Sequence, residues 1–207
     1  MSLAAQTRLI LVRHGQTHWN LQGRYQGRAD TPICAVGLVT ARRVALMLRG
    51  CEATALLASP LQRARVTAEV IGRIPGGLHS VIDERLTEID FGQWQGLTQA
   101  QVKTRWPVLL RAWKHAPDSV CFPGGERLAD ALERLRHFLR CPPWGTGAAP
   151  RCVIAVTHTG PIRLARLLAE NRPLAHYRQV ASQAGAAYEF DWDPPGRLRS
   201  AGQRLLK

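Results

Sequence analysis

Two arginines and two histidines of this sequence have the chemistry of a site for a tetrahedral dianion. Arg13 and His14 are adjacent, Arg63 lies in the first turn of an expected helix, and His158 stands just before another. Guanidinium groups bind phosphate-like oxygens in pairs, and helix N-termini offer N–H donors and partial positive charge. An Arg in a first turn opposes the helix dipole unless an anion is bound nearby. These four residues therefore predict a phosphate-sized anion site.

Three short apolar runs would position these side chains if they form neighbouring strands. The runs cover residues 9–12, 55–58 and 153–156, and each is followed by residues of the proposed site. Continuous apolar runs are typical of strands that are buried on both faces. Strands that alternate with helices favour an α/β fold with a mostly parallel sheet. Ligands bind beyond the carboxyl ends of such strands, so one sheet edge should hold all four residues.

Further elements follow from periodicity and turn residues. Residues 59–62 (Ser-Pro-Leu-Gln) form a capping-box pattern with Pro at the first helical position, which predicts a helix start. A loop is expected over residues 141–150, but the strand after it must pair with strands before it, which favours a single domain over residues 1–207. Helices are expected over residues 37–48, 126–139 and 159–169, a weak strand at 81–82, a late edge strand at 186–192, and a short cap or lid at about 97–125.

Five motifs, in this order, resemble the histidine phosphatase superfamily, which includes cofactor-dependent phosphoglycerate mutases. The resemblance implies a three-layer α/β/α sandwich and hydrolysis of phosphomonoesters through a phosphohistidine, with no metal and no cofactor. The motifs are Arg13-His14-Gly15-Gln16-Thr17 with Asn20, Ser59-Pro60-Leu61-Gln62-Arg63-Ala64, residues 86–96, Pro123-Gly124-Gly125-Glu126, and Val156-Thr157-His158-Thr159-Gly160.

The resemblance also implies a role for each matching residue. His14 would be the nucleophile, attacking through Nε2 while its Nδ1–H bonds a backbone carbonyl. Glu88 would protonate the leaving oxygen and then accept a proton from water. The remaining catalytic and substrate-binding residues, which would hold the phosphoryl group, are Arg13, Asn20, Arg63, His158 and Thr159.

Several alternatives remain open from the residues alone. Asp83 and Glu84 compete with Glu88 for the role of the acid, and His14 and His18 have a spacing that could suit a metal. Three positions depart from the family pattern: Gln95 replaces a usual Glu, Ile33 stands where Leu is common, and Arg127 replaces a usual Ser and could add a cation near the mouth of the site.

Side chains around the expected lid also have two interpretations. The aromatic residues Trp106, Trp113 and Phe122 are expected to pack in the core or lid rather than form a specificity surface. Arg24, Tyr25 and Arg28 could line the entrance or lie on a solvated surface.

The short span between Glu88 and His158 favours the phosphatase branch of the family over the mutases. That branch includes broad-specificity enzymes and the α-ribazole-5′-phosphate phosphatases of cobalamin biosynthesis. A small phosphorylated metabolite is therefore the expected substrate, possible substrates including α-ribazole 5′-phosphate. The alternatives are a cofactor-dependent phosphoglycerate-type mutase and a non-catalytic module that binds phosphorylated ligands or nucleic acid.

Composition narrows the class of partner. The net charge is +13, but all but three of the 28 basic residues are Arg and they are spread along the chain. No interleaved basic and aromatic pattern is present, so no nucleic-acid partner is expected. No apolar run reaches the length of a membrane span, and the five cysteines form no CxxC pair. We expect a cytoplasmic protein with reduced, buried thiols and no membrane partner; the sequence gives no oligomeric state.

Overall fold

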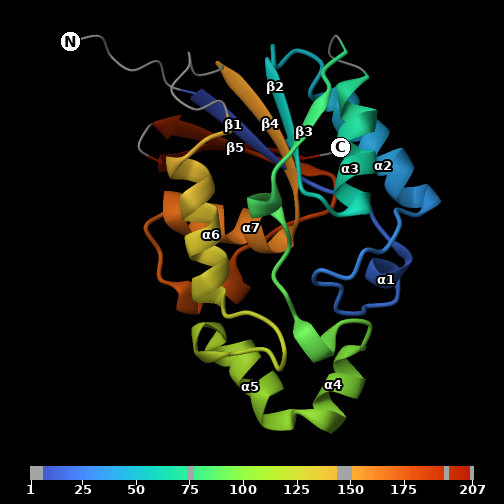
Figure 1. The fold of residues 1–207 in the computed structure, drawn as a ribbon, viewed down its shortest axis with the longest axis vertical. Coiled ribbons are helices and arrows are strands. Elements are labelled where there is room, and N and C mark those ends of the chain that lie inside the picture. The colour runs from blue at the N-terminus through green and yellow to red at the C-terminus, as the bar shows by residue number, and fades with distance from the viewer. Residues whose placement is uncertain (1–6, 74–76, 144–150, 194–195, 206–207) are drawn as a thin grey trace.

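A six-stranded sheet forms the centre of the computed structural model, which describes residues 7–73, 77–143, 151–193 and 196–205 (Figure 1). The strand order is β3-β2-β4-β1-β5-β6. The pairings β3–β2, β2–β4 and β4–β1 are parallel, whereas β1–β5 and β5–β6 are antiparallel. The strands are β1 (Thr7–Arg13), β2 (Ala55–Ala58), β3 (Ser80–Ile82), β4 (Cys152–Thr157), β5 (Ala186–Asp193) and β6 (Arg197–Leu205).

The three apolar runs predicted as strands are β1, β2 and β4, and they are neighbours in the sheet. Every residue of β4 is buried, as expected for a strand with covered faces. Leu9 and Leu11 pack into one apolar cluster, while Ile10 and Val12 pack into a second cluster on the opposite face. This alternation explains why the runs are continuously apolar: both faces of the strands need apolar side chains.

Helices cover the two faces, which confirms the α/β/α sandwich. Helices α2 (Ala35–Met47) and α3 (Gln62–Gly72) pack together and share the cluster that contains Ile10. Helices α6 (Leu128–Arg140) and α7 (Thr159–Ala169) pack together on the other cluster. Figure 1 shows the two pairs on either side of the sheet. Helix α7 begins and ends as predicted from the sequence.

The segment between the sheet and α6 forms a small helical layer beyond the carboxyl ends of the parallel strands (Figure 1). Trp113 and Phe122 are buried there and their rings pack edge to face at 5.0 Å. These aromatic rings form core packing under the expected lid, although Trp113 also reaches the cavity described below. The elements of this segment are the helices α4 (Gln99–Arg105) and α5 (Pro107–His115) and the 3₁₀ turns η1 (Glu84–Leu86), η2 (Gly92–Trp94) and η3 (Pro117–Ser119). Two further short elements are α1 (His18–Leu21), which follows β1, and the 3₁₀ turn η4 (Leu174–Gln179), which follows α7.

Three expectations about local structure are wrong. Strand β5 is not an edge strand, because β6 pairs with its outer side. The polar sequence of β6 carries little apolar periodicity, so this strand was not predicted.

The cysteines were expected to be buried, but the thiols of Cys121 and Cys141 are exposed, whereas those of the other three are buried. The capping box at Ser59 does not form: α3 begins at Gln62, whose backbone N–H donates instead to Asp30 Oδ1 at 2.6 Å. The expected loop over residues 141–150 lies outside the described residues from position 144 onward.

Candidate active site

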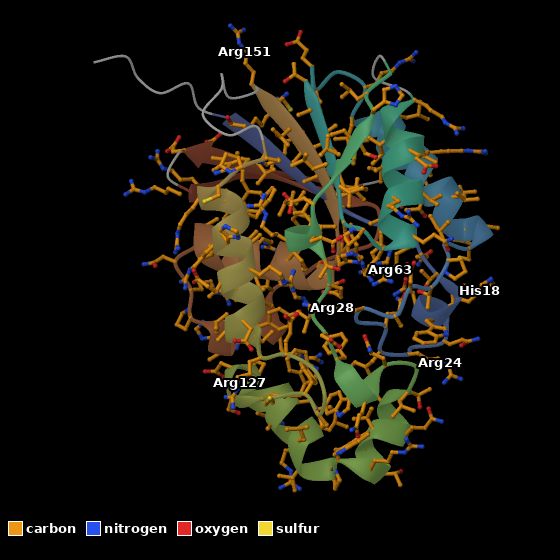
Figure 2. All side chains as sticks on the ribbon, in the orientation of Figure 1. His18, Arg24, Arg28, Arg63, Arg127 and Arg151 are labelled. Carbon is orange, nitrogen blue, oxygen red and sulfur yellow. The ribbon has the colours of Figure 1, made fainter. Side chains whose placement is uncertain are left out.

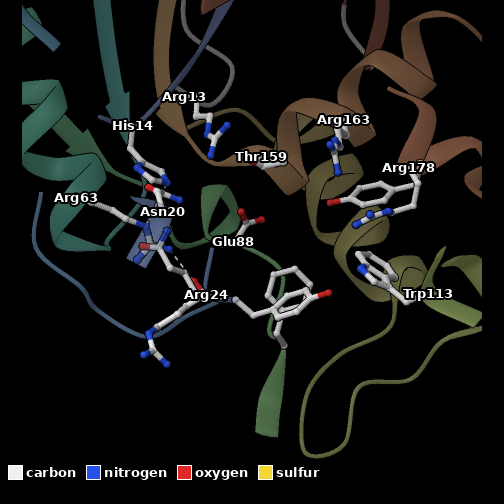
Figure 3. A pocket seen from close by; sticks show the side chains of 15 residues that line it. Arg13, His14, Asn20, Arg24, Arg63, Glu88, Trp113, Thr159, Arg163 and Arg178 are labelled. Atoms are coloured by element: carbon white, nitrogen blue, oxygen red, sulfur yellow. Dashed lines mark hydrogen bonds between the residues drawn. The ribbon is translucent and has the colours of Figure 1, made fainter. Parts of the chain in front are cut away.

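Arg13, His14 and Arg63 line one cavity at the carboxyl ends of the parallel strands (Figure 3). His158, which follows β4, does not line this cavity but lies fully buried beside His14. The rings of His14 and His158 lie 4.9 Å apart between centroids. Arg63 Nε donates a hydrogen bond to His14 Nε2 at 3.3 Å. Arg13, which ends β1, lines the same cavity. The convergence expected from the strand order is therefore present.

Hydrogen bonding fixes the tautomer of His14. Arg63 Nε can only donate, so His14 Nε2 must present its lone pair. His14 Nδ1 lies 2.7 Å from Gly15 O and is the donor of that bond. Burial, followed by the charges of Arg63 and Arg13, lowers the pKa of His14 well below its ordinary value of 6.5. The imidazole is therefore neutral near pH 7, with Nε2 facing the cavity.

Close backbone packing at Gly15 holds this ring in place. A Cβ at Gly15 would collide with Gly37 O of α2, so the turn after β1 requires glycine. Gly15 N donates to Thr67 Oγ1 at 2.9 Å, which ties the turn to α3. Contacts with α2 and α3, two helices of the same layer, therefore fix the position of the turn that follows His14.

Arg63 is fully buried and fixed by main-chain carbonyls. Its Nη1 donates to Ala29 O at 2.7 Å and its Nη2 to Gly27 O at 2.6 Å. Gln95 Oε1 in turn accepts from the backbone N–H groups of Arg28 and Ala29. Burial lowers the pKa of Arg63 to about 10, so the guanidinium stays charged at neutral pH. Gln95, the departure noted in the sequence, therefore supports the loop that orients Arg63.

His158 is paired with the serine that fails to cap α3. Ser59 Oγ lies 2.7 Å from His158 Nε2, and both side chains are fully buried. This bond explains why the predicted capping box is absent, since the hydroxyl is used across the sheet edge. Burial and the neighbouring Arg63 and His14 lower the pKa of His158 well below 6.5. Ser59 is a site residue that its sequence motif marked only as a helix start.

Glu88 is the carboxyl group of the cavity. Its Oε1 accepts from the backbone N–H groups of Ile89 and Gly160, each at 2.9 Å. A Cβ at Gly160 would collide with this oxygen, so glycine is needed for α7 to approach the carboxyl group. Burial raises the pKa of Glu88 above its ordinary 4.5, against the smaller opposing effects of these N–H groups and of Arg63 and Arg13. A protonated fraction is thereby favoured at mildly acidic pH.

The competing residues lie elsewhere. Asp83 is bonded to Arg85 through both carboxylate oxygens, Glu84 is exposed, and His18 is exposed and outside the cavity. Arg127 does not line the cavity but precedes α6 on the surface. Within the described ranges, no group of three or more His, Cys, Asp or Glu side chains is arranged so that it could bind a metal ion.

The cavity has a volume of about 160 Å³. Asn20 and Thr159 line it as expected, and so do Arg24 and Tyr25, whereas Arg28 pairs with Glu126. Sequence reasoning missed three further lining residues from α7 and η4, whose positions depend on long-range packing. They are Arg163, Tyr177 and Arg178.

The two buried histidines make stability sensitive to acid. Because the folded-state pKa values of His14 and His158 lie below 6.5, the unfolded chain binds protons there that the folded chain does not. The free energy of unfolding should therefore be highest above pH 6.5 and fall as the pH drops toward the folded-state values, by up to about 1.4 kcal/mol per pH unit for each histidine. Denaturant unfolding between pH 7 and 5 measures this slope.

Histidine variants provide the control for this effect. His14→Gln and His158→Gln should each flatten the pH slope, and the double variant should flatten it further. The raised pKa of Glu88 acts in the opposite sense, since its contribution is full below 4.5 and is lost as the pH rises through the folded-state value. An unchanged slope in both single variants would contradict buried neutral histidines.

Comparison with known families decides the assignment. The model of the histidine phosphatase superfamily (branch 1) matches residues 9–200. The chain belongs to this superfamily. The resemblance to this family is thereby confirmed, and the expectation of a phosphoric monoester hydrolase holds for this histidine phosphatase.

Relatives with phosphatase names support the same conclusion. Phosphoserine phosphatase 1 of Hydrogenobacter thermophilus is 35% identical over 75% of this chain and 72% of its own length. Glucosyl-3-phosphoglycerate phosphatase of Mycobacterium tuberculosis is 32% identical over 96% of this chain and 92% of its own. Among solved structures, a candidate α-ribazole-5′-phosphate phosphatase from Escherichia coli has a TM-score of 0.81 at 25% identity, with 97% of this chain and 98% of that chain covered.

In the described part of this chain, no helix has the length and apolar character needed to cross a membrane.

Proposed function

We propose that this histidine phosphatase hydrolyses small phosphomonoesters in two steps, with His14 as the nucleophile. The observation that carries the proposal is the hydrogen bond from Arg63 Nε to His14 Nε2, which requires Nε2 to be unprotonated at the wall of a cationic cavity. Its lone pair can attack phosphorus once a bound phosphoryl group takes over the Arg63 guanidinium. The cavity volume of about 160 Å³ fits a small ligand rather than a polymer. This size argues against a nucleic-acid partner despite the net charge of +13.

In the first step, His14 Nε2 attacks phosphorus as the bond to the leaving oxygen breaks. Arg13 and Arg63, which line the cavity, hold the phosphoryl oxygens, and Asn20 and Thr159 contribute to substrate binding. His158, whose ring lies 4.9 Å from that of His14, assists them from behind the cavity wall. The protonated carboxyl group of Glu88 donates its proton to the leaving alcohol. The products of this step are the free alcohol, phosphohistidine and the Glu88 carboxylate.

In the second step, the same groups act in reverse. The Glu88 carboxylate removes a proton from water as the water oxygen bonds to phosphorus. The P–N bond breaks, the electron pair returns to His14 Nε2, and inorganic phosphate leaves. Positioning and charge stabilisation do most of the work in phosphoryl transfer, so the cationic side chains supply what a metal supplies elsewhere.

The leaving group and the setting of the protein are further parts of the proposal. The relatives are named for phosphoserine, glucosyl-3-phosphoglycerate and α-ribazole phosphate, which all contain a phosphomonoester and differ in the alcohol that carries it. A place in cobalamin biosynthesis is one setting consistent with the third name. We place the protein in the cytoplasm because its five free cysteines fit a reducing compartment, and we treat residues 1–207 as one domain.

Trapping the intermediate tests the mechanism directly. Wild-type protein in EDTA, mixed with p-nitrophenyl phosphate and quenched in alkali, should carry an acid-labile phosphate on the peptide that contains His14. A mutase would instead need a bisphosphate primer and transfer the group to a second alcohol. A binding module would show no turnover. Loss of activity in EDTA, or a phosphate on another residue, would reject the mechanism.

A further inference from the structure

The cavity has two unlike sides. His14, Arg63 and Asn20 lie together, and Arg163, Arg178 and Trp113 lie across the cavity from them, with Glu88 between the two groups (Figure 3). A phosphoryl group held by His14 therefore directs its leaving oxygen past Glu88 toward the second group. The alcohol part of the substrate has to occupy that second side.

Positive charge on the second side has no counter-charge. Arg163 from α7 and Arg178 from η4 form no ion pair with a carboxylate of the described chain. Several other arginines do, among them Arg28, which is labelled in Figure 2 and pairs with Glu126. Five arginines line the cavity, and Glu88 is its single carboxyl group. Even when it is ionised, this one carboxyl group can offset only one of the five guanidinium charges.

Aromatic rings fix both guanidinium groups at the cavity. The Arg163 guanidinium lies 5.3 Å from the Tyr177 ring centroid, and Arg178 lies 5.5 Å from that of Trp113. Arg163 Nε is buried and has no hydrogen-bond partner among the described residues. An unpartnered buried donor on a cation costs free energy unless a ligand satisfies it. Tyr177 and Trp113 are themselves buried, so they hold the two cations in place.

We infer that the alcohol part of the substrate carries a second anionic group, a carboxylate or a phosphoryl group, bound by Arg163 and Arg178. This inference rests on the proposed function, because it takes His14 as the position of the reacting phosphoryl group. Bidentate guanidinium contacts suit either anion. The substrate class is thus a small phosphomonoester with two anionic ends, and an uncharged alcohol is a poor leaving group for this enzyme.

Matched substrate pairs test the inference. The pairs are 3-phosphoglycerate with glycerol 3-phosphate, and O-phosphoserine with O-phosphoethanolamine, each differing by one carboxylate; 1,3-propanediol bisphosphate with 3-hydroxypropyl phosphate tests the phosphoryl group. In at least one pair, the wild type should show a kcat/KM about 10-fold or more higher for the substrate that carries the second anionic group than for the substrate that lacks it.

Variants then assign the preference to the two arginines. Arg163→Gln and Arg178→Gln should each lower kcat/KM for the preferred member by about 10- to 100-fold and change that for its partner by less than about 3-fold. Arg136→Gln, which removes an exposed charge on α6 paired with Glu133, should change neither.

The outcomes separate this inference from the mechanism. Turnover of p-nitrophenyl phosphate that depends on His14, with no preference in any pair, overturns the second anion site alone. Equal losses for both members of a pair in the Arg163 and Arg178 variants also overturn it. Turnover that survives loss of His14 overturns the proposed function itself.

Discussion

His14→Ala is expected to lower kcat for p-nitrophenyl phosphate by a factor on the order of 10⁴ or more. The substitution removes the atom that forms the covalent bond, and no other described nucleophile occupies its place beside Arg63. Water could attack phosphorus directly, but it would lack the fixed lone pair that the bonds from Arg63 and to Gly15 create. Steady-state assay in EDTA measures the effect.

An exposed histidine four residues further along the chain, His18, supplies the control. His18→Ala should retain the wild-type kcat, because His18 lies outside the cavity. The substitution should also leave α1 intact, since the side chain of Thr17, and not that of His18, caps this helix. Circular dichroism of both variants should match the wild type. Activity in His14→Ala within about 10-fold of wild type would remove the covalent mechanism, since no remaining group could carry the phosphoryl group.

Much of the site could be predicted because its parts are encoded locally. Each apolar run ends at a residue of the site, and parallel neighbours bring their carboxyl ends to one edge. The adjacency of Arg13 and His14, and the first-turn position of Arg63, follow from sequence positions alone. The fold class likewise follows from alternating strands and helices, and the structure confirms that class.

The missed features depend on contacts between distant residues. Ser59 was interpreted as a helix cap, but its hydroxyl is bonded to a residue 99 positions away. Arg163 and Arg178 face the cavity only because η4 packs against α7 and the lid aromatics. Strand β6 has no clear periodicity of its own and is held by pairing with β5.

The acid segment shows how such distant contacts set a single carboxyl group. Arg134 of α6 donates to the backbone carbonyls of Arg85 and Thr87, at 2.9 and 2.8 Å. Glu126 accepts from Arg134 and from the backbone N–H of Asp90, each at 2.9 Å. The segment on both sides of Glu88 is therefore tied to the start of α6. Glu126 of the Pro-Gly-Gly-Glu turn therefore helps to position the segment that carries Glu88, which explains why the two motifs occur together.

Glu88→Gln is expected to lower kcat for alkyl phosphates by about 10²- to 10⁴-fold. The amide oxygen can keep the bonds from Ile89 and Gly160, so the site retains its shape while the transferable proton is lost. An alkoxide leaves poorly without that proton, which slows the first step. Turnover of 3-phosphoglycerate, an alkyl phosphate, measures this loss, and Glu84→Gln, at an exposed position four residues earlier, should leave that turnover unchanged.

The same variant should behave differently with p-nitrophenyl phosphate. Nitrophenolate leaves without help, so the first step should remain fast in Glu88→Gln, while the second step lacks the base that activates water. Stopped-flow mixing should then show a burst of nitrophenolate close to one equivalent per site, followed by slow turnover, and phosphohistidine should accumulate. If alkyl and nitrophenyl substrates lose the same factor without a burst, Glu88 only shapes the cavity. A burst confined to Glu88→Gln requires that this one carboxyl group serve both half-reactions.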